Sequence, residues 1–332
     1  MPDVLPGAHP VRFRGRPRAI LARSTGRPGE VILDDSLAPP PGLPERRPRW
    51  GWHLALFAAT FVTALTAGSW FWEGTLDPRA SWLENLSPSR LSQGIPYAVL
   101  LLAILLAHEL GHYVACRRYG VPATLPYFIP GIPMLVGTFG AVIRIKGRIP
   151  SRKALFDIAA AGPIAGFLVA VPVMVVGVVR AIEIPPDPTA GGSLGPPLFS
   201  TVLERLFHGT ADIRVNGIYG AAWVGMLVTS MNLFPVGQLD GGHAVFAVAP
   251  RAHRVVSWCT IAAVFALVVS QTVLLASVSS YTLWLVILLL LRGRHPRLGE
   301  EEAPLGRGRI AIAVMLALIF VLTFIPVPLS FN

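Results

Sequence analysis

The amino-acid sequence predicts an all-α membrane protein: a polytopic bundle of about seven transmembrane helices, with a small membrane-associated β hairpin or strand near residues 125–145. Hydrophobic residues make up 53% of its 332 residues and charged residues only 14%, whereas a typical soluble domain carries about 25% charged residues. Apolar runs long enough to cross a bilayer recur along the chain, and basic residues gather in alternate connections between them. This composition excludes a soluble enzyme, a disordered chain and a disulfide scaffold.

The first 50 residues are expected to form a flexible, Arg- and Pro-rich tail ahead of a transmembrane domain at 51–332. The tail holds nine Arg and shows no sustained apolar periodicity. A signal peptide has a short apolar core followed by a cleavage site of small residues, and the tail has neither. We therefore expect the tail to stay attached and to lie in the cytoplasm.

The apolar runs define the expected spans. They cover approximately residues 52–72, 95–116, 155–182, 215–235 and 310–325, together with the stretch 255–291. That last stretch carries no charge and is long enough for two spans with a break near Ser279, although a single span is the alternative.

The distribution of basic residues predicts the orientation. With a cytoplasmic N-terminus, the inside segments 1–51, 117–154, 236–254 and 292–309 hold 23 of the 28 Lys and Arg residues. This asymmetry follows the positive-inside rule, whereas a nucleic-acid-binding patch would explain neither the spans nor the alternation. The strong excess of Arg over Lys, with abundant Ala, Gly and Pro, favours a bacterial cytoplasmic membrane over a plastid membrane.

Ionisable side chains lie inside the second span, where each charge costs at least about 2.5–3.5 kcal/mol on insertion scales. In His108-Glu109-Leu110-Gly111-His112 the two histidines are four residues apart, so they share one helical face and can reach one metal ion. Glu109 is the expected general base for a water whose pKa a zinc ion lowers to roughly 7. The alternative is a His/Glu cluster hydrogen-bonded at a helix end.

A third metal ligand is expected from the end of the fourth span. Asp240 follows Pro235 and Gly237, which break the helix, and unwound backbone is tolerated at this depth where it lines a polar cavity. Because the second and fourth spans run in the same direction, Asp240 and the histidines lie near the same membrane face. His243 competes as a ligand, but it lies further past the break and would close the position that a water needs.

Two further polar residues have competing interpretations. Asn232 can donate its amide to a developing oxyanion or form a helix–helix hydrogen bond. Asp157, near the start of the third span, is expected to be an acid near a helix N-terminus or a partner of Arg152 or Lys153.

Several motifs in order resemble the site-2 protease family of intramembrane zinc metalloproteases, in particular its compact type without a PDZ domain. The resemblance covers about 95–250, the expected catalytic core. Its motifs are the His108–His112 stretch, Gly137-Thr138-Phe139-Gly140-Ala141-Val142-Ile143, Ala161-Gly162-Pro163-Ile164-Ala165-Gly166, and the stretch from Asn232 to Gly242 with Leu239-Asp240-Gly241-Gly242. The spacing of Gly162 and Gly166 permits close helix packing.

The resemblance implies one zinc ion per chain, held by His108, His112 and Asp240, with Glu109 as general base and acid. It implies hydrolysis of a peptide bond in or near a transmembrane segment of a membrane-protein substrate, close to the cytoplasmic face, with Asn232 as a substrate or oxyanion contact. The segment 125–145 is expected to be a hairpin whose edge pairs with an unwound substrate, rather than a cytoplasmic linker. The residues expected to pair with the substrate are Gly137, Thr138, Phe139 and Gly140.

Other functions remain as alternatives. A metal transporter would need polar ligands along a pathway on both sides of the site, and the spans offer almost none. A non-catalytic scaffold that binds transmembrane helices would tolerate the loss of Glu109, which is present. A serine-type intramembrane protease is disfavoured because no Gly-x-Ser-x-Gly motif occurs. The expected partners are a transmembrane substrate and the lipid bilayer, with no nucleic acid.

Overall fold

The computed structural model describes residues 23–24, 31–32, 50–133, 135–185, 192–274, 279, 281–291 and 304–331. The chain divides into two units, Met1–Pro48 and Arg49–Asn332. In the first unit, β1 (Arg23–Ser24) pairs antiparallel with β2 (Val31–Ile32), and the rest of the expected tail lies outside the described residues. All other elements belong to the second unit.

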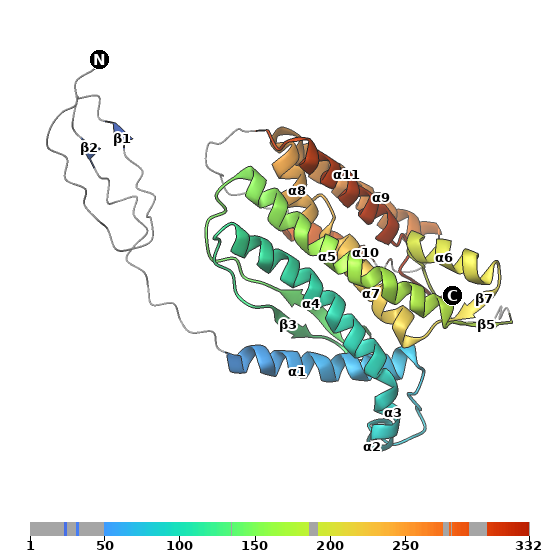
Figure 1. Ribbon diagram of the computed structural model, residues 1–332. Helices are drawn as coiled ribbons and strands as arrows, with labels where there is room; N and C mark the ends of the chain where they lie inside the picture. Colours follow the sequence, from blue (N-terminus) through green and yellow to red (C-terminus); the bar gives the residue numbers. More distant parts are fainter. Residues whose placement is uncertain are drawn as a thin grey trace, which may run out of the picture. The chain divides into compact units, whose positions relative to one another are not determined.

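Helices dominate the second unit, as the sequence predicts (Figure 1). In chain order they are α1 (Trp50–Ala67), continued by a π-helix (Gly68–Trp72), α2 (Trp82–Asn85), α3 (Pro88–Leu91), a 3-10 turn (Ser92–Gly94), α4 (Ile95–Arg118), α5 (Arg152–Val179), α6 (Leu198–His208), α7 (Gly217–Asn232), α8 (Asp240–Val248), α9 (Pro250–Leu274), α10 (Tyr281–Leu291) and α11 (Arg307–Thr323). Each apolar run identified in the sequence lies largely on a helix.

Four helical segments among the described residues are long and apolar enough to cross a membrane: Trp50–Trp72, Trp82–Arg118, Arg152–Val179 and Pro250–Val273. The chain is therefore a multi-pass membrane protein.

The other three expected spans correspond to shorter helices, so the structure supports four candidate spans rather than the full set of seven. They are α7 with 16 residues, α10 with 11 and α11 with 17. α7 is short because it ends at Asn232, just before the helix-breaking Pro235. Within the run 255–291 the chain forms two helices, α9 and α10, with Ser279 outside both.

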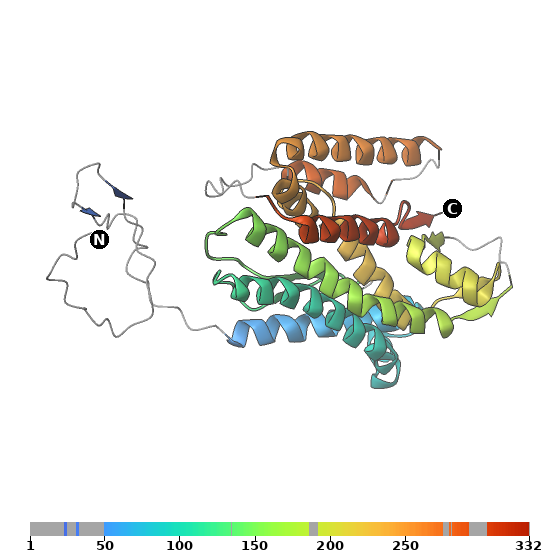
Figure 2. The ribbon, with the colours of Figure 1, turned by 45° about the horizontal axis from the view of Figure 1, so that its top comes forward.

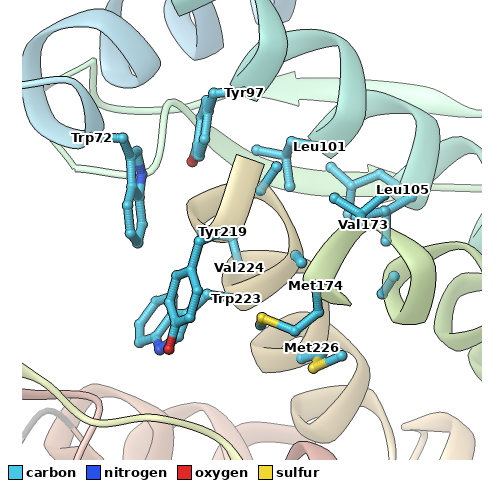
Figure 3. Close-up of a cluster of buried hydrophobic side chains, with 14 of the residues drawn as sticks. Trp72, Tyr97, Leu101, Leu105, Val173, Met174, Tyr219, Trp223, Val224 and Met226 are labelled. Carbon is cyan, nitrogen blue, oxygen red and sulfur yellow. The ribbon is translucent and has the colours of Figure 1, made fainter. Parts of the chain in front are cut away.

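Helices α4, α5 and α7 pack against one another and form the centre of the bundle (Figures 1 and 2). Their contact surfaces bury Leu101 and Leu105 of α4, Met174 of α5 and Trp223 of α7 in one hydrophobic cluster (Figure 3). The approach of α4 to α5 requires glycine, because a Cβ at Gly111 would lie 2.3 Å from the carbonyl oxygen of Ala161. Such small residues let transmembrane helices pack closely.

The expected hairpin is present. Strand β3 (Tyr127–Pro130) pairs antiparallel with β4 (Thr138–Val142), and a bridge between Ala123 and Ile145 extends the pairing. The hairpin lies along α1, where Thr63 Oγ1 donates a 2.6 Å hydrogen bond to the carbonyl oxygen of Gly137. Its tip reaches the first turn of α4, where Tyr97 donates its hydroxyl to the carbonyl oxygen of Val136 at 2.8 Å.

Small elements lie at the end of the bundle where α5 ends and α7 begins, the same end at which Tyr97 of α4 approaches Gly217 of α7. Strand β5 (Ile182–Ile184) pairs with β7 (Asp212–Arg214), and β6 (Gly192–Leu194) pairs with β8 (Leu329–Phe331). Between β6 and β7 lies α6, an amphipathic helix that the Pro- and Gly-rich composition of this connection did not reveal.

Candidate metal centre

The two histidines of the HExxH motif lie in the second half of α4. His108, Glu109 and His112 are all buried there, each with at most 7% of its surface exposed. The helical spacing brings the Nε2 atoms of His108 and His112 to 3.2 Å from each other. Two imidazoles therefore present nitrogen atoms to one point in the interior.

Asp240 approaches the same point from another element. After α7 ends at Asn232, the chain turns through Gly237, whose φ of +53° favours glycine, and α8 begins at Asp240. Asp240 Oδ2 lies 3.3 Å from Nε2 of His108 and 3.2 Å from Nε2 of His112. All three potential ligand atoms lie within 4.8 Å of one another, so the structure joins the residues selected from the sequence.

The donor set fits a zinc ion. Zinc in proteins binds imidazole nitrogen and carboxylate oxygen, and catalytic sites supply three protein ligands. His112 also shows the second contact typical of a metal-ligating histidine, because its Nδ1 donates a 2.7 Å hydrogen bond to the carbonyl oxygen of Ile158 on α5. In the neutral imidazole this bond leaves Nε2 with its lone pair facing the cluster.

Glycines of α5 provide the space for these imidazoles. A Cβ at Gly162 would lie 2.1 Å from Nε2 of His112, and one at Gly166 would lie 3.2 Å from Cβ of His108. The spacing of these two glycines in the sequence predicts close helix packing. The structure shows that they also border the metal-ligand cluster.

Glu109 faces the end of the hairpin. Its Oε2 accepts a 2.9 Å hydrogen bond from the backbone N–H of Ile143, one residue past β4. The next N–H, that of Arg144, turns the other way and bonds to Oγ1 of Thr124. The strand edge at Ile143 therefore faces Glu109, a contact between distant segments that no local sequence pattern signals.

A cavity of about 280 Å³ joins these groups. Its lining residues are His108, Glu109, His112, Ala141, Val142, Ile143, Ile145, Ile149, Leu155, Ile158, Ala159, Asn232, Gln238, Asp240 and His243. The polar groups converge from α4 and the 232–243 stretch, whereas the hairpin and α5 supply apolar walls. Such a cavity, apolar with a few convergent polar groups, is typical of a binding site.

The remaining predicted residues take different positions. Asn232 lines the cavity, with Nδ2 3.4 Å from Nε2 of His108. His243 also lines the cavity, but it is not part of the three-residue cluster found among the described residues.

The four residues expected to pair with a substrate lie in the hairpin but not on the described lining of the cavity. Gly137 packs on α1, and Thr138 donates its hydroxyl to the carbonyl oxygen of Ile129 on β3. Phe139 is 66% exposed, and Gly140, with a φ of +98°, donates its backbone N–H to Oγ1 of Thr138 at 2.9 Å. The part of the strand that reaches the cavity is 141–143.

The expectation for Asp157 is wrong. α5 begins at Arg152, so Asp157 lies beyond the first turn, where the helix dipole acts most strongly. Its carboxylate instead accepts two hydrogen bonds from Arg309 of α11, at 2.8 and 2.7 Å, and one from the hydroxyl of Tyr119. Partners that are far apart in the sequence could not be inferred from helix position alone.

Comparison with known proteins places the same residues in one family. Residues 96–276 match peptidase family M50, and this range contains the whole metal-ligand cluster. A chloroplastic protein of Oryza sativa subsp. indica, described as "Probable zinc metalloprotease EGY2", is 31% identical over 267 residues, which cover 77% of this chain and 46% of the relative. Its counterpart in Arabidopsis thaliana is 29% identical over 253 residues, covering 73% and 43%.

A third relative, the chloroplastic "Probable zinc metalloprotease EGY1" of Arabidopsis thaliana, is 35% identical over 169 residues, covering 46% of this chain and 29% of the relative. The chain thus spans about half the length, or less, of these curated relatives. The family match extends over more than half of the chain and agrees with the buried His/His/Asp cluster. The chain belongs to peptidase family M50, the site-2 protease family of zinc metalloproteases.

Proposed function

We propose that this protein is a zinc-dependent intramembrane endopeptidase that hydrolyses peptide bonds in or near transmembrane segments of membrane-protein substrates. The observation that carries the proposal is the cluster of His108, His112 and Asp240 beside Glu109, because His108, Glu109 and His112 are buried on a helix long enough to span a membrane. Ionisable residues buried at such a position are costly and are functional by default.

One zinc ion per chain would be held by His108, His112 and Asp240. When bound, it supplies a Lewis acid that polarises the scissile carbonyl and acidifies a water. Glu109 takes the proton of the attacking water at its carboxylate and delivers it to the nitrogen of the leaving amine. The Asn232 amide, at the same end of the cavity, donates to the oxygen of the scissile carbonyl as charge develops there.

The hairpin offers a route for the substrate. A transmembrane helix must unwind before a protease can reach its backbone, and unwound backbone inside a bilayer needs hydrogen-bond partners. In the proposal an unwound substrate adds to the strand edge beside Glu109 as a further strand, and takes the Ile143 N–H that bonds to Glu109 in its absence. In this proposal the segment 137–140 starts the paired edge, and 141–143 carries it past the cavity.

We extend the proposal to topology. Seven spans, with α7, α10 and α11 as short ones, place the N-terminus and the metal centre near the cytoplasmic face, because 23 of 28 basic residues then lie inside. The membrane is the bacterial cytoplasmic membrane, with a plastid membrane as the alternative that the chloroplastic relatives raise. The proposal includes the compact type without a PDZ domain, which the short stretches 119–151 and 180–216 between the core helices support.

A metal transporter is the second candidate. It requires a succession of ligand sites through the bundle, whereas the part of the chain that the structure describes holds one group of three close ligands. A non-catalytic scaffold would have no use for a buried carboxylate directed at a cavity. Both candidates would use the same His/Glu/Asp cluster, but neither predicts peptide-bond cleavage that depends on Glu109, so loss of cleavage in Glu109→Gln separates them from a protease.

The proposed function is tested by proteolysis without a preselected substrate. The purified full chain is reconstituted in liposomes with a library of tagged single-span proteins, and new N-termini are mapped by mass spectrometry. We expect wild-type protein to cut within or beside the apolar segments, toward one membrane face. Glu109→Gln should lower the rate by about 10²–10⁴-fold, the usual contribution of a general base. Equal cutting by both proteins would reject the assignment.

A further inference from the structure

A polar cluster formed by Tyr119, Asp157 and Arg309 lies outside the metal-ligand set. Arg309 binds both carboxylate oxygens of Asp157, through Nε at 2.8 Å and Nη2 at 2.7 Å. The hydroxyl of Tyr119 donates to Oδ2 of the same carboxylate, and Nη2 of Arg309 donates to that hydroxyl at 3.3 Å. Both charged side chains are less than one third exposed, and a bidentate pair fixes geometry more strongly than a single contact.

This cluster connects three helices at the metal centre. Tyr119 directly follows α4, which carries both histidines, whereas Asp157 lies on α5 and Arg309 on α11. Asp157 immediately precedes Ile158, whose carbonyl oxygen accepts the Nδ1 hydrogen bond of His112. The ion pair and the group that orients a metal ligand therefore belong to adjacent residues of α5.

The N-terminal part of α5 is held from a second side. Arg152 donates from Nε and Nη2 to the carbonyl oxygen of Ala247, at 3.1 and 2.7 Å. Ala247 lies near the end of α8, the helix that begins with Asp240. α5 is thus anchored to α8 through Arg152 and to α11 through Asp157, and the segment between these anchors and Gly162 contacts His112.

We propose that Arg309 is a positioning residue for the metal centre: by binding Asp157 it fixes α5, so that the Ile158 carbonyl and Gly162 hold His112 in its ligating orientation. The inference rests on the proposed function and adds a residue from α11, which lies beyond the family match at 96–276. Arg309 acts through α5, because its hydrogen bonds among the described residues go to Asp157, Tyr119 and Leu305 and not to the three ligand residues.

The expected effect follows from the contact that Arg309 supports. Removing a group that directly hydrogen-bonds a metal-ligating histidine costs roughly 10–100-fold in metal affinity. Because Arg309 acts one step further away, we expect Arg309→Gln and Asp157→Asn each to weaken zinc binding by about tenfold. The double variant should be no weaker than either single variant, since both break the same interaction.

The test measures zinc affinity of the full chain in detergent, by competition with a chromophoric chelator. Arg307→Gln is the matched control, because Arg307 lies on the same helix and its side chain makes no hydrogen bond or ion pair with any described residue. A charge exchange, Asp157→Arg with Arg309→Asp, should recover part of the affinity. Cobalt(II) binding adds a spectroscopic readout: its visible absorption should change in Arg309→Gln but not in Arg307→Gln.

Each outcome decides a different claim. Wild-type zinc affinity in folded Arg309→Gln, or an equal loss in Arg307→Gln, would overturn the positioning role and leave the proposed function standing. If Arg309→Gln does not fold, Arg309→Lys, which keeps the charge but loses the bidentate geometry, takes its place and should show an intermediate affinity. A wild-type protein that binds neither zinc nor cobalt would overturn the proposed function, and this inference with it.

Discussion

Buried polar side chains have different partners in the two halves of α4. Near its start, Tyr97 is fully buried among aromatic rings and directs its one hydroxyl to a backbone carbonyl of the hairpin (Figure 3). Near its end, His108, Glu109 and His112 are equally buried but face one another and a cavity. One hydrogen bond is enough to bury the single hydroxyl of Tyr97 at low cost in free energy. Burying several titratable side chains around one point costs much more, and a catalytic role explains why the protein retains them.

The same contrast runs along α5, whose glycines face the cluster at one end and α7 at the other. A Cβ at Gly162 would meet the side chain of His112, and one at Gly177 would meet the backbone of Tyr219, 2.6 Å from its Cα. A side chain can swing away, but a backbone segment must shift. Substitutions at the two ends should therefore affect different properties, and the following predictions test this difference in order of decreasing effect.

The largest effect is expected at Asn232, whose two interpretations predict different losses. As an oxyanion donor, Asn232→Ala lowers kcat by about 10²–10³-fold with zinc content unchanged. As a helix–helix contact, the same substitution lowers the melting temperature and leaves kcat nearly intact. Kinetics on a cleaved reporter, run beside a thermal melt, decide between them. An unchanged kcat with a lower melting temperature would show that Asn232 stabilises the fold and is not an oxyanion donor.

Gly162→Ala should weaken zinc binding by about 100-fold, because the new methyl group displaces the His112 ring that Gly162 borders. Stability should change little, since the ring can rotate away. Zinc affinity and thermal unfolding are measured on the same preparation. Normal zinc affinity in a folded Gly162→Ala protein would show that His112 is not a ligand in this orientation.

Gly177→Ala is the matched variant at the other end of α5. Here the methyl group forces α5 and α7 apart, so we expect a loss of about 1–3 kcal/mol in the free energy of unfolding, typical of overpacking. Zinc affinity should remain at the wild-type value. If Gly177→Ala weakened zinc as much as Gly162→Ala does, the functional division between the two ends would fail.

A smaller effect is expected at His208 on α6, at the end of the bundle away from the metal centre. The carbonyl oxygen of Val178 and the carboxylate of Glu183, at 2.9 and 3.1 Å, raise the pKa of His208 above its ordinary value. Because the folded-state pKa is raised, the stabilisation is complete below the unfolded value of about 6.5 and is lost as the pH rises through the folded pKa.

His208→Gln should therefore lower the melting temperature more at pH 5.5 than at pH 9, and leave zinc affinity unchanged. Melting curves of both proteins at the two pH values give the comparison. If the melting temperature falls equally at both pH values, the positive charge of His208 does not contribute to stability.

The features predicted correctly from the sequence are those with a recognisable sequence pattern. Apolar runs located the helices, and the three residues selected as metal ligands lie within 4.8 Å of one another. The hairpin was recognised from its motif, and its pairing is confirmed. These features depend on residues that are close together in the sequence or on the order of the helices, and both can be read from the sequence.

The failures involve contacts between distant segments. The pairing of Asp157 with Arg309 joins residues 152 positions apart, and the bond from Ile143 to Glu109 joins a strand edge to a helix. Neither has a periodic or spacing signal. The role of Gly162 was predicted only in part. Its motif indicated close helix packing, but the sequence does not show that Gly162 borders the ring of His112.

The central claim is that His108, His112 and Asp240 bind one zinc ion and leave Glu109 free to act as the base. We would measure zinc per molecule in detergent-purified wild type, Asp240→Ala, His243→Ala and Glu109→Gln. About one zinc is expected in wild type, His243→Ala and Glu109→Gln, and little or none in Asp240→Ala. Zinc retained without Asp240 but lost without His243 would contradict the ligand set, and folded wild type without zinc would contradict the metal centre.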